Sequence, residues 1–347
     1  MKAYIVLENG EIFEGTRIGA QNDVCGELVF STTAGGYIET VTDPSYFGQI
    51  VVGTFPLMGN YGIIEDDLES DKPALAAFVT SSVCETPSNF RCDGTLESYL
   101  EKQGIVALCG VDTRRITTII RENGVMNAKI VSDLKDAGVD EIKTYSIKDA
   151  VKSVSTKEPA VFKAEGEKKF NVALLDLGVK RSLIKSLCTL GCDVTVFPFN
   201  TGADELLKYD GVVISEGPGD PSDNAEVIKT VGEIFGKKPI FAAGLGHQLM
   251  ALSAGGKVEK LKYGHRGGSQ PVKDLNKNRV YITNQNHGFA VDAESLPGFA
   301  VVTHVNANDG TCEGISYPNH SAFSVQFSPN RETLNRFITL MEVSSCR

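Results

Sequence analysis

Two glycine-rich loops follow apolar runs in the second half of the chain, and their residues could hold a ligand or present a nucleophile. In the first loop, residues 215–221 (SEGPGDP), the glycines allow backbone N–H groups to approach a bound group closely, although a plain tight turn uses the same residues. In the second, residues 241–248 (FAAGLGHQ), an apolar strand runs into a helix through a sharp turn. This is the setting of a nucleophile elbow. The residue at the turn, Gly244, has no side chain.

The elements that must position these loops alternate between strand and helix. Apolar runs at residues 172–175, 194–197, 212–214 and 240–243 are separated by segments with helical periodicity at 181–190 and 225–235. Uninterrupted apolar strands between helices predict a parallel sheet with helices on both faces. Ligands of such sheets lie beyond the carboxyl ends of the strands, which is where both loops fall.

The first half of the chain has a different pattern. Short β-type runs are broken by Gly, Asp-Pro and Asn-Gly, with a hairpin signal at residues 4–13 and helical periodicity at 96–103 and 114–121. Residues 155–169 are polar and poor in periodic apolar residues, as a linker usually is. We therefore predict an α/β protein with a mixed, strand-led domain at 1–154, a linker at 155–169 and an open, mostly parallel sheet domain at 170–347.

Composition narrows the function classes. The 347 residues are 41% hydrophobic and 22% charged, no apolar run is long enough to cross a membrane, and no export signal is recognisable at the start, so a cytoplasmic protein is expected. A formal net charge of -10 argues against nucleic acid as a partner. The eight cysteines, from Cys25 to Cys346, form no CxxC pair, and no metal site is predicted.

Four segments of the second half, taken together, resemble a class I glutamine amidotransferase domain: the two loops above, residues 284–289 (NQNHGF) and residues 323–330 (FSVQFSPN). The first half of the chain narrows this resemblance to one family of amidotransferases. Residues 26–50, 55–62 (FPLMGNYG), 69–73 (ESDKP) and 110–117 (GVDTRRIT) resemble the amino-terminal domain of carbamoyl-phosphate synthase small subunits. The resemblance spans essentially the whole chain.

The resemblance implies a role in making carbamoyl phosphate for arginine and pyrimidine synthesis. Small subunits of this family cleave glutamine and pass ammonia through a tunnel to a large subunit, which uses bicarbonate, ATP and Mg²⁺. The implied partner is therefore a large subunit, glutamine is a possible ligand, and this chain itself needs no cofactor. By the same resemblance, the glutamine-binding positions are Thr33, Gly217, Gly219, Leu245, Gln248, Asn286, Gly288 and Phe289. Gly217 and Leu245 would supply backbone N–H groups to the oxyanion.

The catalytic positions depart from the family pattern. Glutaminase chemistry needs a thiolate, a histidine that moves protons and a carboxylate that orients the histidine. The family places its cysteine at the elbow, where this chain has Gly244, and its histidine and glutamate at the positions of Ser328 and Asn330. Serine is no general base near neutral pH, and asparagine carries no charge. His247, His287 and Cys312 lie in or near the same segments, and we expect them to be structural.

Three hypotheses remain open. The first is a pseudo-glutaminase that still serves a carbamoyl-phosphate synthase large subunit while free ammonia supplies the nitrogen. The second is a stand-alone regulatory protein that binds glutamine in the surviving pocket without a large-subunit partner. The third is a residual hydrolase with an unrecognised nucleophile.

Overall fold

The computed structural model describes residues 1–345, so that Cys346 lies outside the described residues. The chain forms two compact units, one of residues 1–148 with 266–268 and one of residues 149–265 with 269–347. Among the described residues no helix is both long enough and apolar enough to cross a membrane. The seven described cysteines are free thiols.

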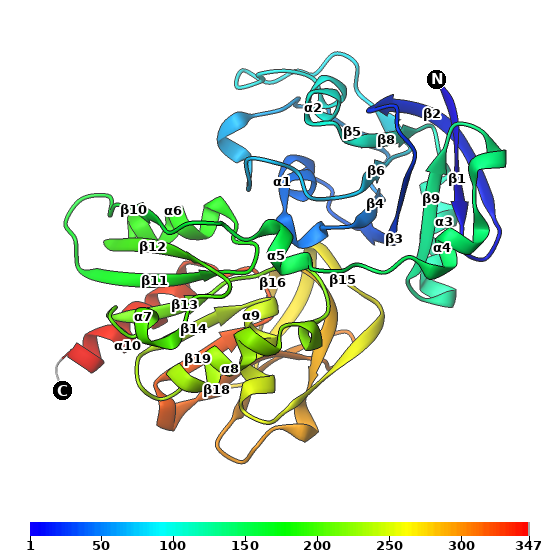
Figure 1. Cartoon of the computed structure of the whole chain (residues 1–347). Coiled ribbons are helices and arrows are strands. Elements are labelled where there is room, and N and C mark those ends of the chain that lie inside the picture. Colours follow the sequence, from blue (N-terminus) through cyan, green and yellow to red (C-terminus); the bar gives the residue numbers. More distant parts are fainter. Residues whose placement is uncertain (346–347) are drawn as a thin grey trace. The chain divides into compact units, whose positions relative to one another are not determined.

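The first unit is built on a closed barrel with the strand order β1-β2-β8-β6-β4-β3-β9 (Figure 1). Its strands are β1 (Lys2–Leu7), β2 (Ile12–Gly19), β3 (Val24–Ser31), β4 (Gln49–Gly53), β6 (Ala77–Val79), β8 (Val106–Cys109) and β9 (Met126–Val131). The predicted hairpin is present as β1 and β2, with Gly10 at φ +89° in its turn. Such a positive φ is readily adopted only by glycine.

Short helices and a small sheet complete this unit: α1 (Tyr37–Thr42), α2 (Leu96–Gln103), α3 (Thr113–Asn123), α4 (Val139–Thr144), β5 (Leu57–Met58) and β7 (Ser82–Val83). The two predicted helices coincide with α2 and α3. Each begins at a side chain that accepts a hydrogen bond from the first turn, Thr95 for α2 and Asp112 for α3. These caps satisfy N–H groups that have no partner inside the helix.

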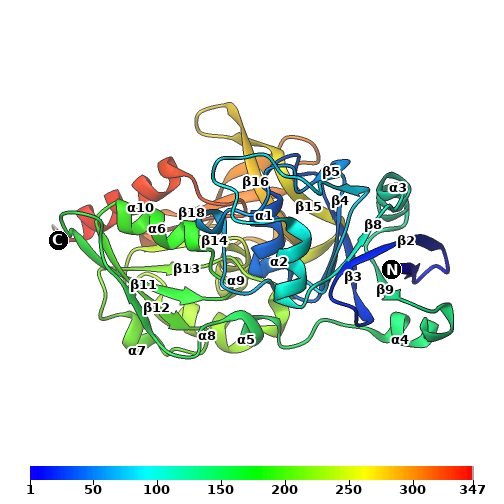
Figure 2. The ribbon, with the colours of Figure 1, turned by 90° about the horizontal axis from the view of Figure 1, so that it is seen from above.

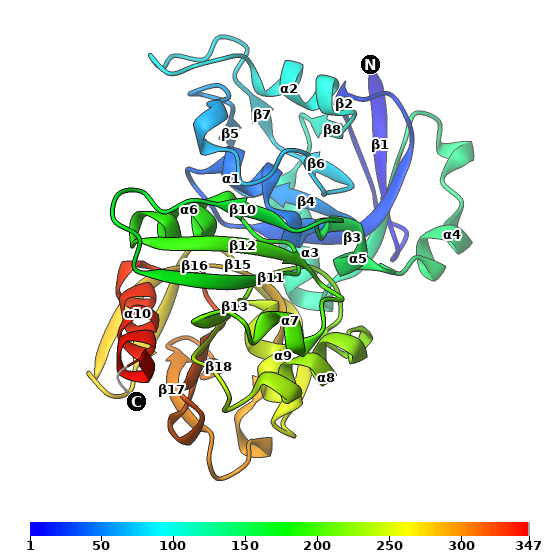
Figure 3. The same cartoon turned by 60° about the vertical axis from the view of Figure 1, so that its left-hand side comes forward.

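The second unit is a ten-stranded sheet with the order β10-β12-β11-β13-β14-β19-β18-β16-β15-β17, whose strands β10, β12 and β11 lie at the front of Figure 3. Five neighbouring strands are parallel: β12 (Cys192–Pro198), β11 (Phe170–Asp176), β13 (Gly211–Ile214), β14 (Ile240–Ala243) and β19 (Ala322–Val325). The other strands are β10 (Ala160–Phe162), β15 (Lys257–Asp274), β16 (Arg279–Asp292), β17 (Val301–Asn306) and β18 (Cys312–Tyr317).

Helices cover both faces of the parallel strands, as the apolar runs predict (Figure 2). The helices are α5 (Ala150–Val154), α6 (Arg181–Thr189), α7 (Ala203–Leu206), α8 (Ala225–Ile234), α9 (Leu245–Ser253) and α10 (Arg331–Ser345). Side chains of α6 and α10 pack with one face in one apolar core, and those of α7, α8 and α9 pack with the opposite face in another. The fold class predicted from the sequence is therefore confirmed.

The polar segment 155–169, for which a linker is predicted, belongs to the second unit in the structure and carries β10. This strand pairs antiparallel with β12 at the edge of the sheet. Its Val161 and Phe162 side chains are 59% and 42% exposed. An edge strand with little buried surface has weak hydrophobic periodicity, which is why the sequence pattern there is that of a linker.

Candidate functional site

Gly244 alone makes the turn from β14 to α9. Its φ and ψ are +53° and −117°, a conformation that residues with a side chain rarely adopt, and its N–H donates to the Val325 carbonyl at 3.0 Å. Glycine adopts it at little cost. The strand-to-helix elbow expected from the sequence is thus present, but the residue at its turn has no side chain.

The space in front of Gly244 is bordered by Glu216. A Cβ built on Gly244 would lie 3.0 Å from Cγ and 3.1 Å from Cβ of Glu216, which is tighter than most Cβ contacts. Glu216 follows β13, the strand next to β14 in the sheet. Any side chain at position 244 would therefore be in very close contact with the Glu216 side chain.

Glu216 is held by Lys180 in a buried ion pair. The Lys180 ammonium Nζ lies 2.6 Å from Glu216 Oε2 and donates to Ser328 Oγ at 2.7 Å. Lys180 and Glu216 are 7% and 6% exposed. Lys180 follows β11, and Ser328 follows β19, so all three side chains come from the carboxyl ends of the parallel strands, where such sheets place their sites. Ser328 is a predicted site position, whereas neither Lys180 nor Glu216 is.

The contacts of Ser328 do not activate it as a nucleophile. Serine and lysine form catalytic pairs when a neutral amine can take the hydroxyl proton. Here the lysine faces a carboxylate, and an ammonium in such an ion pair has no lone pair with which to accept a proton. Lys180 consequently donates to Ser328 Oγ instead of removing its proton.

Two loop glycines of the predicted pocket are required by the backbone. A Cβ on Gly217 would lie 2.2 Å from the Leu177 carbonyl oxygen, and Gly219 has a φ of +91°. Ser215 fastens the loop, because its hydroxyl accepts from the Leu177 N–H at 2.9 Å and donates to the Glu216 carbonyl at 2.7 Å. The close approach and the positive φ explain both glycines without a ligand.

The structure joins two other pocket residues directly. Gln248 Nε2, on α9, donates to the Phe289 carbonyl of β16 at 2.9 Å and to Gln326 Oε1 at 2.9 Å. Asn286 and Gly288 lie on the same stretch of β16, and Leu245 is the first residue of α9, whose N–H has no acceptor inside the helix. The structure therefore places these residues of the predicted pocket on two elements, α9 and β16, that are in contact through Gln248.

Thr33 belongs to the first unit and is described there alone. Its hydroxyl lies 2.9 Å from Ser31 Oγ, and its N–H donates weakly to the same oxygen at 3.4 Å. These contacts hold the end of β3 and fix the direction of the Thr33 side chain.

His247 and Cys312 are buried, and neither side chain is activated for catalysis. His247 Nδ1 is 2.8 Å from Ser324 Oγ, and burial lowers the pKa of this histidine to about 3, so it is neutral near pH 7. Burial raises the pKa of the Cys312 thiol to about 12, which leaves no thiolate to act as a nucleophile. The geometry is that of structural residues, as expected from the sequence.

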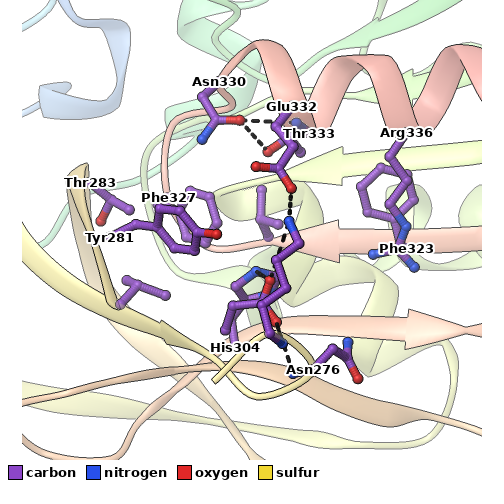
Figure 4. A pocket seen from close by; sticks show the side chains of 14 residues that line it. Asn276, Tyr281, Thr283, His304, Phe323, Phe327, Asn330, Glu332, Thr333 and Arg336 are labelled. Atoms are coloured by element: carbon purple, nitrogen blue, oxygen red, sulfur yellow. Dashed lines mark hydrogen bonds and ion pairs between the residues drawn. The ribbon is translucent and has the colours of Figure 1, made fainter. Parts of the chain in front are cut away.

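Ser328 and Asn330 follow β19 and make different contacts: Ser328 contacts Lys180, and Asn330 contacts α10. Along β19 and its continuation the side chains alternate, so that Ser324 contacts His247 and Gln326 contacts Gln248, whereas Phe323, Val325 and Phe327 face the opposite side. Asn330 caps α10: its Oδ1 accepts from the Thr333 N–H at 2.9 Å and from the Thr333 hydroxyl at 3.0 Å (Figure 4). Asn330, which the sequence resemblance places at the carboxylate position of the family, is therefore a helix cap in this chain.

Asn330 also lines a cavity of about 370 Å³ beside the first turns of α10 (Figure 4). Apolar walls from Phe323, Val325 and Phe327 meet charged groups from the β15–β16 hairpin and α10. The lining residues are Val272, Asp274, Asn276, Lys277, Tyr281, Thr283, His304, Phe323, Val325, Phe327, Asn330, Glu332, Thr333 and Arg336. Lys277 is paired with Asp274 and Glu332, so the charges within the cavity largely balance.

Comparisons with known proteins agree with this arrangement of domains. Residues 5–130 match the family model "Carbamoyl-phosphate synthase small chain, CPSase domain", and residues 173–333 match "Glutamine amidotransferase class-I". The carbamoyl phosphate synthase small chain of Clostridium perfringens is 48% identical over 334 residues, covering 95% of this chain and 94% of that protein. Those of Syntrophotalea carbinolica and Bacillus cereus are 43% and 42% identical, each covering 99% of this chain and 98% and 96% of those proteins. The chain belongs to the family of carbamoyl-phosphate synthase small subunits, with a carboxyl-terminal class I glutamine amidotransferase domain.

Proposed function

We propose that this chain is a pseudo-glutaminase: it serves a carbamoyl-phosphate synthase large subunit without hydrolysing glutamine, and free ammonia supplies the nitrogen. The observation that carries the proposal is Gly244 at the elbow, because an acyl-enzyme cannot form where no nucleophile exists. The product would enter arginine and pyrimidine synthesis, as in the family.

The surroundings of Gly244 support the proposal. A histidine at position 328 would take protons from the nucleophile, whereas Ser328 here accepts a hydrogen bond from an ammonium. Asn330, at the carboxylate position, caps α10. Each position of the former triad thus has contacts that serve packing or capping, and none of them leaves a group able to move a proton.

A nitrogen-donor comparison tests the proposal. The chain is mixed with the large subunit of the same organism, and carbamoyl phosphate formation is measured with glutamine and with ammonium chloride at equal free ammonia background. We expect synthesis with ammonium and only background synthesis with glutamine, in the wild type and equally in Gly244→Ala, which adds a methyl group but no nucleophile. Equal efficiency with glutamine, or a glutamyl adduct detected on the chain by mass spectrometry, would refute the proposal.

A stand-alone, glutamine-binding regulatory role is the second candidate, and the contact between Gln248 and Phe289, two residues of the predicted glutamine pocket, favours it. Calorimetry separates the two candidates. Under this alternative, glutamine binds the isolated chain, binding is weakened in Gln248→Ala, and a large subunit neither binds the chain nor changes its glutamine affinity. Formation of a complex with the large subunit would exclude it.

A further inference from the structure

Three buried side chains from the antiparallel part of the second sheet converge on one point. They are His265 of β15, His287 of β16 and Glu313 of β18, with 8%, 6% and 0% exposure. His265 Nδ1 lies 3.5 Å from Glu313 Oε1, and His287 Nε2 lies 3.9 Å from the same oxygen. One ring nitrogen of each histidine and one oxygen of Glu313 lie within 4.8 Å of one another. The two imidazole rings meet edge to face, with centroids 5.0 Å apart.

The far side of each histidine is held by a hydrogen-bond acceptor. His265 Nε2 is 2.8 Å from Asp309 Oδ2, and His287 Nδ1 is 2.8 Å from the Phe289 carbonyl oxygen. These acceptors can hold a proton on the outer nitrogen of each ring, which would leave His265 Nδ1 and His287 Nε2 to bind an ion once the contact of His287 Nε2 with Gln285 Oε1 opens. This is the pattern of metal-binding histidines, which almost always donate their second N–H to a carboxylate or a backbone carbonyl.

The outer oxygen of the carboxylate is held in the same way. Glu313 Oε2 accepts from Gln285 Nε2 at 3.0 Å, which leaves Oε1 directed toward the histidines. Around a tetrahedral ion with ligand bonds of about 2.0–2.2 Å, neighbouring ligand atoms lie roughly 3.4 Å apart. The 3.5 Å separation already fits this geometry, and the 3.9 Å separation needs to close by about 0.5 Å. The two histidine nitrogens, which lie within 4.8 Å of each other, must approach to the same spacing.

We propose that His265, His287 and Glu313 bind a divalent transition-metal ion of the zinc type, which ties β15, β16 and β18 together. Two imidazoles and one carboxylate suit Zn²⁺ and similar ions, whereas Mg²⁺ and Ca²⁺ prefer oxygen ligands alone. Because the three ligands are buried, the ion would have a structural role. His287 lies between Asn286 and Gly288, so the ion would also hold the strand that carries the predicted glutamine pocket. The site does not depend on the proposed function.

Two side-chain amides and a proton compete with the ion. Asn306 Nδ2 lies 3.3 Å from Glu313 Oε1 and 3.4 Å from His265 Nδ1, and Gln285 Oε1 lies 3.0 Å from His287 Nε2. Ion binding requires the Asn306 amide to turn away and the His287 contact with Gln285 to open. Because histidine and carboxylate ligands must be deprotonated to bind an ion, metal binding should weaken at low pH.

Cobalt titration tests the site. The full chain, with any affinity tag removed, is stripped with a chelator and titrated with Co²⁺ and then Zn²⁺, while bound metal is counted by mass spectrometry. We expect one Co²⁺ per chain, visible absorption of a tetrahedral ion without the intense near-ultraviolet band of a thiolate complex, and displacement by Zn²⁺. Failure to bind one ion per chain, or a thiolate band from the cysteines, would overturn the proposal.

Variants locate the ion. Glu313→Gln keeps the shape of the side chain and should weaken Co²⁺ binding by more than about 100-fold, whereas Asp309→Asn removes only an outer partner and should weaken it by about 10- to 100-fold. His320→Gln, a half-buried histidine elsewhere in the unit, is the matched control and should bind like the wild type. Circular dichroism checks that each variant is folded, and His265→Asn replaces Glu313→Gln if the latter is not. Undiminished binding in a folded ligand variant would contradict the assignment.

Discussion

The ammonium of Lys180 lies 2.6 Å from the carboxylate of Glu216, and both side chains are less than a tenth exposed. Lys180 also donates to Ser328, the residue that the sequence resemblance places at the histidine position of the family. The pair borders the elbow from which the nucleophile is missing. The strand ends around Gly244 and Ser328 are thus occupied by a buried ion pair and its hydrogen bond.

Breaking this ion pair from one side should destabilise the second unit strongly. Lys180→Met leaves the Glu216 carboxylate buried without its counter-charge, which typically costs about 3–5 kcal/mol. The double variant Lys180→Met/Glu216→Gln removes both charges and should recover most of the loss. Urea unfolding followed by circular dichroism measures both free energies. A single variant as stable as the wild type would show that the pair contributes nothing.

Restoring a cysteine at the elbow should not restore hydrolysis. In Gly244→Cys the new side chain takes a strained backbone conformation and lies against Glu216, which should cost about 1–3 kcal/mol. The thiol has no base, since Ser328 accepts a hydrogen bond from Lys180. Glutamate release should stay at background, and Gly244→Ala should lose similar stability. A rapid glutaminase produced by the single change would disprove this account of position 328.

The sequence predicts the parallel core well, because its signals are local. The run at 240–243 coincides with β14, and the helical segment at 181–190 differs from α6 by one residue, since apolar strands and glycine turns are marked within a few positions. Closure of the barrel in the first unit is not predictable in this way. It depends on pairs such as β3 with β9, which are distant in sequence and leave no periodic mark of their own.

The candidate site is predictable only in part. Gly244, Ser328 and Asn330 stand out because they depart from a known pattern, but a pattern gives no information about which side chains fill the vacated space. Lys180 and Glu216 are 36 positions apart and meet only because β11 and β13 are neighbours in the sheet. The positions of Lys180 and Glu216 after buried strands are the signal that the sequence offers, since ligands gather at such strand ends.

Asn330 should behave as a helix cap and not as part of a catalytic group. Asn330→Ala removes the acceptor for the Thr333 N–H and should lower the free energy of unfolding by about 1 kcal/mol, whereas Asn330→Asp should retain the cap. Urea unfolding measures stability, and carbamoyl phosphate synthesis from ammonium in the complex measures function. Both variants should synthesise at the wild-type rate. Equal stability of Asn330→Ala and the wild type would contradict the capping role.

His247 should make stability fall as the pH is lowered through the weakly acidic range. The histidine is fully buried, its Nδ1 contacts Ser324 Oγ, and its Nε2 makes no hydrogen bond with any described residue. Burial lowers its pKa from 6.5 to about 3 in the folded state. Between these values the unfolded chain binds a proton that the folded chain does not, so stability is complete above pH 6.5 and declines below it by up to about 1.4 kcal/mol per pH unit.

The comparison of wild type with His247→Gln isolates this contribution, because glutamine can still bond to Ser324 but does not titrate. Free energies of unfolding measured from pH 7.5 down to pH 5 should fall more steeply in the wild type, and the two slopes should agree above pH 7. The contributions of all other groups are the same in both proteins and cancel in the difference. Parallel curves for wild type and His247→Gln would mean that the His247 imidazole can take up a proton in the folded protein, which its burial beside Ser324 argues against.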